Sequence, residues 1–228
     1  MSFKQIPLNP ALVEPVENYV TGIFPSAVGL LGELVKIPGI AWESFDPKNL
    51  ELSAQKVKSA FEAINFFDFV DIRKAKKPNG DWGSPAVLAR RAGSDGAPHV
   101  LLYAHHDVQP PGDSDLWDTE PFQATLKGDR LYGRGASDDK SGIITHLYAL
   151  RGLLELADQV DLGVTLFMEG EEEAGDQNQQ QRSDAVEHAG QHVHAQQHLV
   201  GGNAGQARGL GVVADRVDVA TRRGLAQE

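Results

Sequence analysis

The stretch that decides the fold is an apolar run that ends in histidine and carboxylate, Val100-Leu101-Leu102-Tyr103-Ala104-His105-His106-Asp107. A short apolar run of this kind predicts a buried strand. The pattern recurs at residues 163–168, which lead into the acidic residues 169–173. Between the two, residues 141–156 carry apolar side chains at helical spacing. A strand, a helix and a second strand in this order predict an α/β fold.

The remaining elements before residue 175 extend the same architecture. Apolar side chains at helical spacing predict helices over residues 15–35 and 47–67. Short runs bounded by turn residues predict strands over residues 68–74 and 86–90. We therefore expect a mixed sheet flanked by helices.

The composition of the chain changes abruptly at Gly175. All 16 aromatic residues lie at or before Phe167, and all 10 lysines lie at or before Lys140. Residues 176–228 hold neither type and are rich in Gln, Ala, Gly and His. Because aromatic side chains dominate the burial of apolar surface, this segment has little with which to build a core. We predict one folded unit over residues 1–175 and a disordered, low-complexity tail over residues 176–228.

Composition also excludes several classes of function. The formal net charge of −11 argues against a nucleic-acid or anionic-membrane partner, since both need a basic face. The absence of cysteine rules out disulfides, thiolate metal sites and a cysteine nucleophile in these 228 residues. No apolar run approaches the ~18–20 residues of a membrane span. These features and the lack of a signal-peptide pattern at the start predict a cytoplasmic protein.

Residues able to bind a metal follow three of the predicted apolar runs. His105 and Asp107 follow the first strand, Asp138-Asp139 follow the apolar pair Leu131-Tyr132 through the loop 133–137, and residues 169–173 follow the last strand. Ligand sites in open α/β sheets collect beyond the carboxyl ends of strands, so the three groups can converge. One imidazole with several carboxylates suits Zn²⁺ better than Ca²⁺.

Each group also has a plainer explanation. Asp138-Asp139 fits the start of a helix, where the macrodipole favours acidic residues, and Glu171-Glu172-Glu173 fits a solvated acidic turn. His105 and Asp107 share a face of an extended chain, so the carboxylate can hold the imidazole while His106 points away in a structural role. Taken together, the groups favour a metal site. The four tail histidines match no structural zinc module.

Three ordered motifs resemble the M20 metallopeptidases, and most closely the dipeptidases related to carnosinase. They are Tyr103-Ala104-His105-His106-Asp107-Val108-Gln109-Pro110, Gly133-Arg134-Gly135-Ala136-Ser137-Asp138-Asp139-Lys140 and Glu169-Gly170-Glu171-Glu172-Glu173-Ala174-Gly175. Trp117 and Pro121-Phe122 follow the same pattern. The resemblance covers nearly all of residues 1–175, which would then be part of a zinc-peptidase catalytic domain.

The resemblance implies a role for each motif residue. His105 would bind one metal ion, Asp138 would bridge two, and Glu173 would bind the second. Asp107 would orient His105, and Glu172 would be the general base that takes a proton from a metal-activated water. The implied cofactor is Zn²⁺, two per site, with Mn²⁺ or Co²⁺ as alternatives. The implied substrate is a small peptide or amide, and a homodimer like those of the family is expected only if the family's dimerisation domain is present.

The resemblance stops at Gly175. The family continues with another acidic ligand, a lid and dimerisation domain, and a final ligand histidine, none of which residues 176–228 resemble. We therefore expect a truncated or frameshifted catalytic domain with little peptidase activity. The alternatives are an inactive product, a weak metal-binding module that uses the tail histidines, and a deacylase of N-acyl amino acids.

Overall fold

The computed structural model describes residues 10–174. Three α-helices, six strands and three short 3₁₀ turns follow one another along this part of the chain. The helices are α1 (Val13–Val35), α2 (Lys48–Glu62) and α3 (Lys140–Leu156). The strands are β1 (Phe69–Arg73), β2 (Ala86–Arg91), β3 (His99–His105), β4 (Thr125–Lys127), β5 (Arg130–Tyr132) and β6 (Gly163–Glu169). The 3₁₀ turns are η1 (Pro10–Leu12), η2 (Ser114–Leu116) and η3 (Glu172–Ala174).

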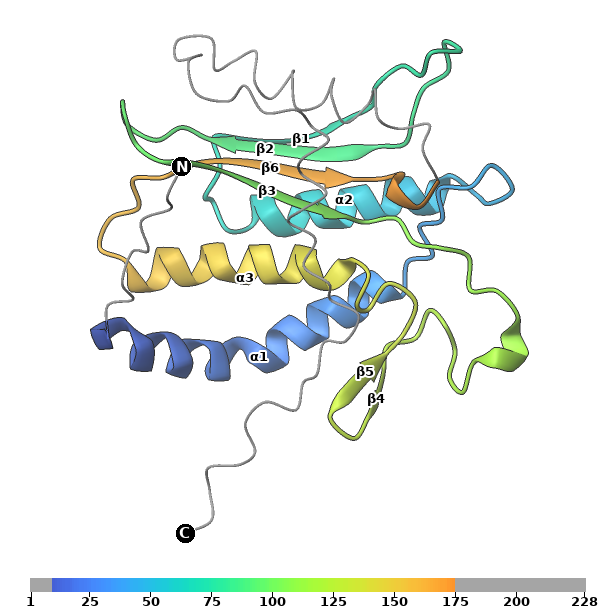
Figure 1. Ribbon diagram of the computed structural model, residues 1–228, viewed down its shortest axis with the longest axis horizontal. Coiled ribbons are helices and arrows are strands. Elements are labelled where there is room, and N and C mark those ends of the chain that lie inside the picture. Colours follow the sequence, from blue (N-terminus) through green and yellow to red (C-terminus); the bar gives the residue numbers. More distant parts are fainter. Residues whose placement is uncertain (1–9, 175–228) are drawn as a thin grey trace, which may run out of the picture.

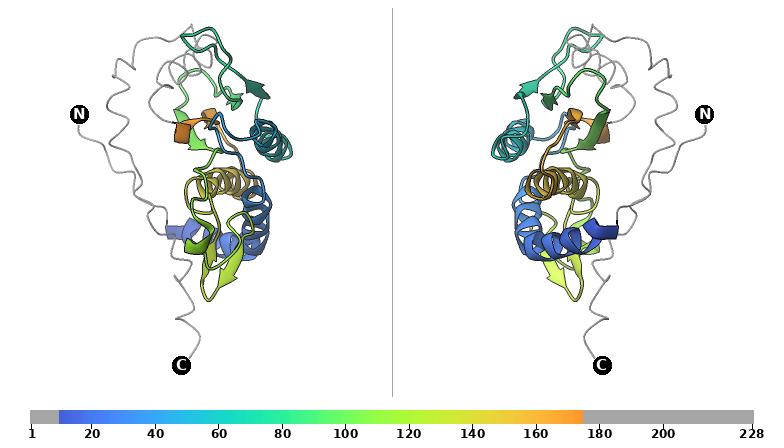
Figure 2. Two further views of the ribbon diagram at one scale, coloured as in Figure 1. Left: turned by 90° about the vertical axis from the view of Figure 1, so that its right-hand side faces the viewer. Right: turned by 90° about the vertical axis from the view of Figure 1, so that its left-hand side faces the viewer.

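Four of the strands form a mixed sheet in the order β1-β2-β6-β3. β1 pairs with β2 and β2 with β6 in antiparallel fashion, whereas β3 runs parallel to β6. The three helices lie on the same side of this sheet, with α1 packed along α3 (Figure 1). Figure 2 shows the helices nearly end-on, beside the strands rather than among them. The predicted α/β fold with a mixed sheet and flanking helices is confirmed.

The core lies between the helices and the sheet. Buried apolar residues of α2 and α3 meet those of β2 and β6, with Leu34 of α1 joining them. β6 is buried along all seven residues, as expected for an apolar run in the middle of a sheet. The fully buried members of this cluster include Val57, Phe61, Val87, Ala104, Val164, Leu166 and Met168.

Two details of the predicted elements are wrong. The strand over residues 100–104 is not buried, because β3 stands at the edge of the sheet: Leu101 is 53% exposed and Tyr103 40%. The second helix ends at Glu62 rather than near Phe67. Asn65 adopts a left-handed backbone with φ of 51°, a conformation that cannot continue a right-handed helix.

The two-stranded sheet of β4 and β5 has no counterpart among the predicted elements. Each strand has only three residues, too few to show an alternating pattern. No helix in the described part of the chain is long and apolar enough to cross a bilayer. The predicted disordered tail, including its four histidines, lies outside the described residues.

Candidate metal centre

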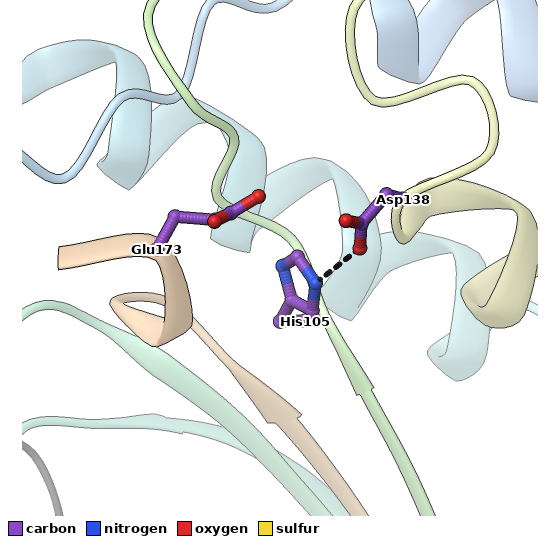
Figure 3. Close-up of side chains that lie close together, drawn as sticks. All are labelled: His105, Asp138 and Glu173. Atoms are coloured by element: carbon purple, nitrogen blue, oxygen red, sulfur yellow. Dashed lines mark hydrogen bonds and ion pairs between the residues drawn. The ribbon is translucent and has the colours of Figure 1, made fainter. Parts of the chain in front are cut away.

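The candidate site lies where β3 and β6 end side by side. The two strands run parallel with His105 next to Glu169, so the segments that follow them leave the sheet at the same end of the strands. The loop before α3 places Asp138 at this end of the sheet, and η3 places Glu173 there (Figure 3). One potential ligand atom from each of His105, Asp138 and Glu173 lies within 4.8 Å of the others. The structure thus brings together all three residues predicted to hold metal.

His105 is buried, and carboxylates flank its ring on two sides. Its Nε2 lies 2.9 Å from Oδ1 of Asp138. Its Nδ1 lies 3.1 Å from the carbonyl oxygen of Asp107 and 3.4 Å from that residue's carboxylate. Because a carbonyl only accepts, Nδ1 carries a proton and donates it to Asp107. The other ring nitrogen, Nε2, faces Asp138.

The carboxylates around His105 decide its charge in the absence of a cation. Burial lowers the pKa of His105, but hydrogen bonds to Asp107 and Asp138, with the charges of both, raise it to about 11. The hydrogen bond from His105 in turn lowers the pKa of Asp138. The imidazole is therefore a cation held between carboxylates. A metal ion can replace that positive charge once the imidazole loses its proton.

Asp107 connects the histidine to the acidic segment. Its side chain is fully buried, and its two carboxylate oxygens accept the backbone N–H groups of Glu172 at 3.2 Å and Glu173 at 2.9 Å. One carboxylate thus contacts the His105 ring and fixes the backbone of η3. This placement is compatible with the predicted orienting role of Asp107, which stays a prediction.

Two side chains from other loops hold Glu173. Nε2 of Gln109 donates to the Glu173 carboxylate at 2.5 Å and to its carbonyl at 3.3 Å. The indole N–H of Trp42 donates to the same carbonyl at 3.0 Å. Burial raises the pKa of Glu173, so a nearby cation would favour its ionised form. Neither Gln109 nor Trp42 was among the candidate residues, because no local pattern links them to Glu173.

The two adjacent aspartates before α3, Asp138 and Asp139, occupy different positions. Asp138 points into the cluster, whereas Asp139 stands at the start of α3 and accepts the backbone N–H of His105 at 3.4 Å. Burial raises the pKa of Asp139. The helix-start explanation therefore holds for the position of Asp139, and the metal explanation fits the position of Asp138.

The loop that delivers Asp138 depends on a glycine and a buried lysine. Gly135 has φ of +79°, and a Cβ atom there would lie 2.5 Å from Cγ1 of Val108. Lys140 is fully buried and donates from Nζ to the carbonyl oxygens of Leu34 at 2.7 Å and Ile37 at 2.8 Å. Burial lowers the pKa of Lys140 to about 7. A lysine in the first turn of a helix opposes the macrodipole, and that conflict is the sequence feature that could have singled it out.

Other polar residues near the motifs face elsewhere. His106 is fully buried, and its Nε2 donates to the carbonyl of Pro85 at 2.8 Å, so its predicted structural role is confirmed. Burial lowers its pKa, as expected for a neutral ring. Glu171 is buried, and its carboxylate accepts the N–H of Ser84 at 3.1 Å. Of the carboxylates at 169–173, only Glu173 joins the cluster of described ligand candidates.

The donor set fits a zinc-type ion. One imidazole nitrogen and two carboxylates converge from three separate segments, and their nearest atoms are close enough to share one cation. The buried Asp107 supplies the hydrogen bond to the second imidazole nitrogen that ligating histidines almost always make.

Comparison with known protein families agrees with this geometry. Residues 101–221, more than half of the chain, match peptidase family M20/M25/M40. The chain belongs to this family. The matched stretch contains all of the candidate ligands and continues beyond Gly175, so the division of the chain at that residue stays a prediction.

Individual relatives of this M20 protein include dipeptidases. Beta-Ala-His dipeptidase of Rattus norvegicus is 31% identical over 141 residues, which are 61% of this chain and 28% of the relative. The solved structure of the dipeptidase Dug1p from Saccharomyces cerevisiae shares the fold, with a TM-score of 0.66 at 22% identity over 76% of this chain and 37% of the other. The M20 family metallo-carboxypeptidase Sso-CP2 of Sulfolobus solfataricus is 31% identical, with a TM-score of 0.54 over 65% and 31% of the two chains. The present chain thus spans about a third of the proteins that it matches.

Proposed function

We propose that this protein is a metal-dependent peptidase that cleaves the amide bond of dipeptides or similarly small substrates. The observation that carries the proposal is the convergence of His105, Asp138 and Glu173 at the ends of two parallel strands. Membership of the M20/M25/M40 family and the dipeptidases among the relatives support it.

Two divalent ions, most simply Zn²⁺, would be shared among these three side chains. His105 would hold one ion, Glu173 would hold the other, and Asp138 would be a ligand shared by both. Mn²⁺ and Co²⁺ suit the same nitrogen and oxygen donors. Ions bound in this way lower the pKa of a water molecule and polarise the carbonyl group of the substrate.

Glu172 is the proposed general base. It lies beside Glu173 in η3, and its backbone N–H is fixed by the buried carboxylate of Asp107. Its carboxylate would take a proton from the attacking water and deliver it to the amine that leaves when the C–N bond breaks. Asp107 would keep both the His105 ring and the Glu172 backbone in place during these transfers.

Metal binding and hydrolysis by the 228-residue chain test the proposal together. Equilibrium dialysis against Zn²⁺ should give about two ions per chain, as expected for a two-ion site, and His105→Ala or Glu173→Gln should reduce that number. Asp118→Asn is the matched control, because the Asp118 side chain is 95% exposed and pairs with Lys127 rather than with a residue of the ligand cluster. Glu172→Gln should keep the metal and abolish dipeptide cleavage.

The outcomes separate the proposal from the alternatives. Zinc bound through His105 and Glu173 without cleavage of any dipeptide would identify an inactive, truncated catalytic domain or a metal-binding module instead of a working peptidase. Zinc binding that survives both substitutions would place the metal elsewhere and contradict the proposed site. A cytoplasmic location remains a prediction from the sequence.

A further inference from the structure

A half-exposed tryptophan lies next to the candidate metal centre. Trp42 is in the loop between α1 and α2 and is 46% exposed. Its indole N–H donates to the carbonyl of Glu173 at 3.0 Å, so the ring stands against the backbone of a proposed metal ligand. This loop and η3 lie side by side at the same end of the sheet (Figure 1).

The loop that carries Trp42 is held firmly on both sides. The backbone N–H of Val108 donates to the carbonyl of Gly39 at 3.0 Å, and Nζ of Lys140 donates to that of Ile37 at 2.8 Å. The N–H of Phe45 closes a turn on the carbonyl of Trp42 itself at 3.0 Å. The loop that exposes the indole is therefore held by the segment that follows β3 and by the first residue of α3.

The chemistry of the ring indicates what it contacts. The only polar atom of the indole is used in the bond to Glu173, so the exposed remainder is hydrocarbon. The exposed part of the ring has no lone pair with which to coordinate a metal ion. An apolar surface beside a cluster of carboxylates is the arrangement found in ligand sites, where apolar walls accompany a few convergent polar groups.

The two other tryptophans are placed differently. The indole N–H of Trp117 donates to Pro111 at 2.8 Å, and its ring packs against the guanidinium of Arg134. Trp82 lies in the turn region after β1, with the ammonium group of Lys76 over its ring at 5.3 Å. In the described part of the chain, Trp42 alone among the tryptophans bonds to a residue of the ligand cluster.

We propose that Trp42 is a specificity-determining residue that forms an apolar wall for a substrate side chain next to the scissile amide. The substrates favoured are dipeptides with large aliphatic side chains rather than glycine. The inference rests on the proposed peptidase function and names the substrate class for that site.

Fluorescence first tests whether Trp42 lies beside the metal. Co²⁺ has unpaired electrons and quenches a nearby indole, so titration of the full chain should lower its emission. Trp42→Phe and Glu173→Gln should each remove most of that decrease, whereas Trp82→Phe should not. Absence of quenching in the wild type would contradict the metal site itself, and with it the proposed function.

Calorimetry then tests the apolar wall. Leu-Leu and Gly-Gly are titrated into the Zn²⁺-loaded chain carrying Glu172→Gln, which prevents hydrolysis. Burial of a leucine side chain against the ring should make Leu-Leu bind about tenfold more tightly than Gly-Gly. Trp42→Ala should abolish this preference, so that Leu-Leu and Gly-Gly bind with similar affinity. Trp42→Phe, which keeps an aromatic surface but loses the hydrogen bond, should retain most of it.

Three outcomes would overturn the inference while leaving the metal site intact. The first is a preference for Leu-Leu that persists in Trp42→Ala. The second is its loss in Trp42→Phe, which would show that the indole N–H positions Glu173 and that the ring surface does not matter. The third is quenching by Co²⁺ without measurable binding of either dipeptide.

Discussion

Replacement of Gly135 by alanine tests how the loop before Asp138 is built. Gly135 has φ of +79°, a left-handed conformation that costs a residue with a Cβ atom about 1–2 kcal/mol. The new Cβ atom would also lie 2.5 Å from Cγ1 of Val108 and 3.3 Å from Cδ of Lys140. Both neighbours are fully buried, so relieving the overlap costs about 1–3 kcal/mol more. We expect Gly135→Ala to lower the free energy of unfolding by about 2–5 kcal/mol.

Urea denaturation followed by circular dichroism measures this loss, and Gly128→Ala is the matched control. Gly128 also has a positive φ, of 63°, but no atom lies within 4 Å of the position of its added Cβ. This control should show only the backbone cost of about 1–2 kcal/mol. The difference between the two variants isolates the clash with Val108 and Lys140. Equal losses in both would refute the argument that Gly135 is required for close packing beneath Asp138.

Three further results are expected. Zinc must displace a proton from His105, because the pKa of this side chain is about 11. Calorimetry in buffers of different ionisation enthalpy should therefore show that zinc binding releases a proton, and the affinity for zinc should rise from about pH 7 to pH 9. A zinc affinity that is independent of pH would contradict this expectation. Asp107→Asn should weaken zinc binding about 10–100-fold in equilibrium dialysis, because the carboxylate contacts His105 and holds η3. Unchanged zinc binding would show that Asp107 does not support the metal site. Lys140→Met should lower the free energy of unfolding by about 2–4 kcal/mol, because two buried carbonyls lose their donor. Burial lowers the pKa of Lys140 to about 7, so the unfolded chain binds this proton more tightly than the folded chain does. In urea denaturation, the free energy of unfolding of the wild type should therefore increase relative to that of Lys140→Met from about pH 7 to pH 10. A decrease in this difference with rising pH would contradict the argument.

The spacing of apolar residues was sufficient to predict the main helices and strands, because the repeat of apolar side chains that marks each element lies within a short segment of sequence. α1, α3 and β6 lie within one or two residues of their predicted bounds, and β6 is buried as its apolar run indicates. The edge position of β3 could not be predicted in this way. An apolar run looks the same whether one neighbour or two will pair with it, and strand order depends on contacts between distant segments.

The candidate site shows the same division. The types of ligand and their positions after strands were visible in the chain, and the motif resemblance singled out His105, Asp138 and Glu173. Among the supporting residues, the motif singled out Asp107 and contains Gln109, but it does not show that Gln109 or Trp42 contacts Glu173. Gln109 and Trp42 reach Glu173 across separations of 64 and 131 residues, which no local pattern records.

The fold class, the order of the elements and the set of residues able to hold a metal can be predicted from the amino-acid sequence, because backbone periodicity and side-chain chemistry are properties of short segments. Which of the carboxylates meet depends instead on tertiary packing. Asp138 faces His105 while Asp139 begins α3, and Glu173 enters the cluster while Glu171 is buried against Ser84. Neighbours of identical charge differ in these roles because loop geometry turns successive side chains towards different surroundings, and those surroundings are assembled from segments far apart in the chain.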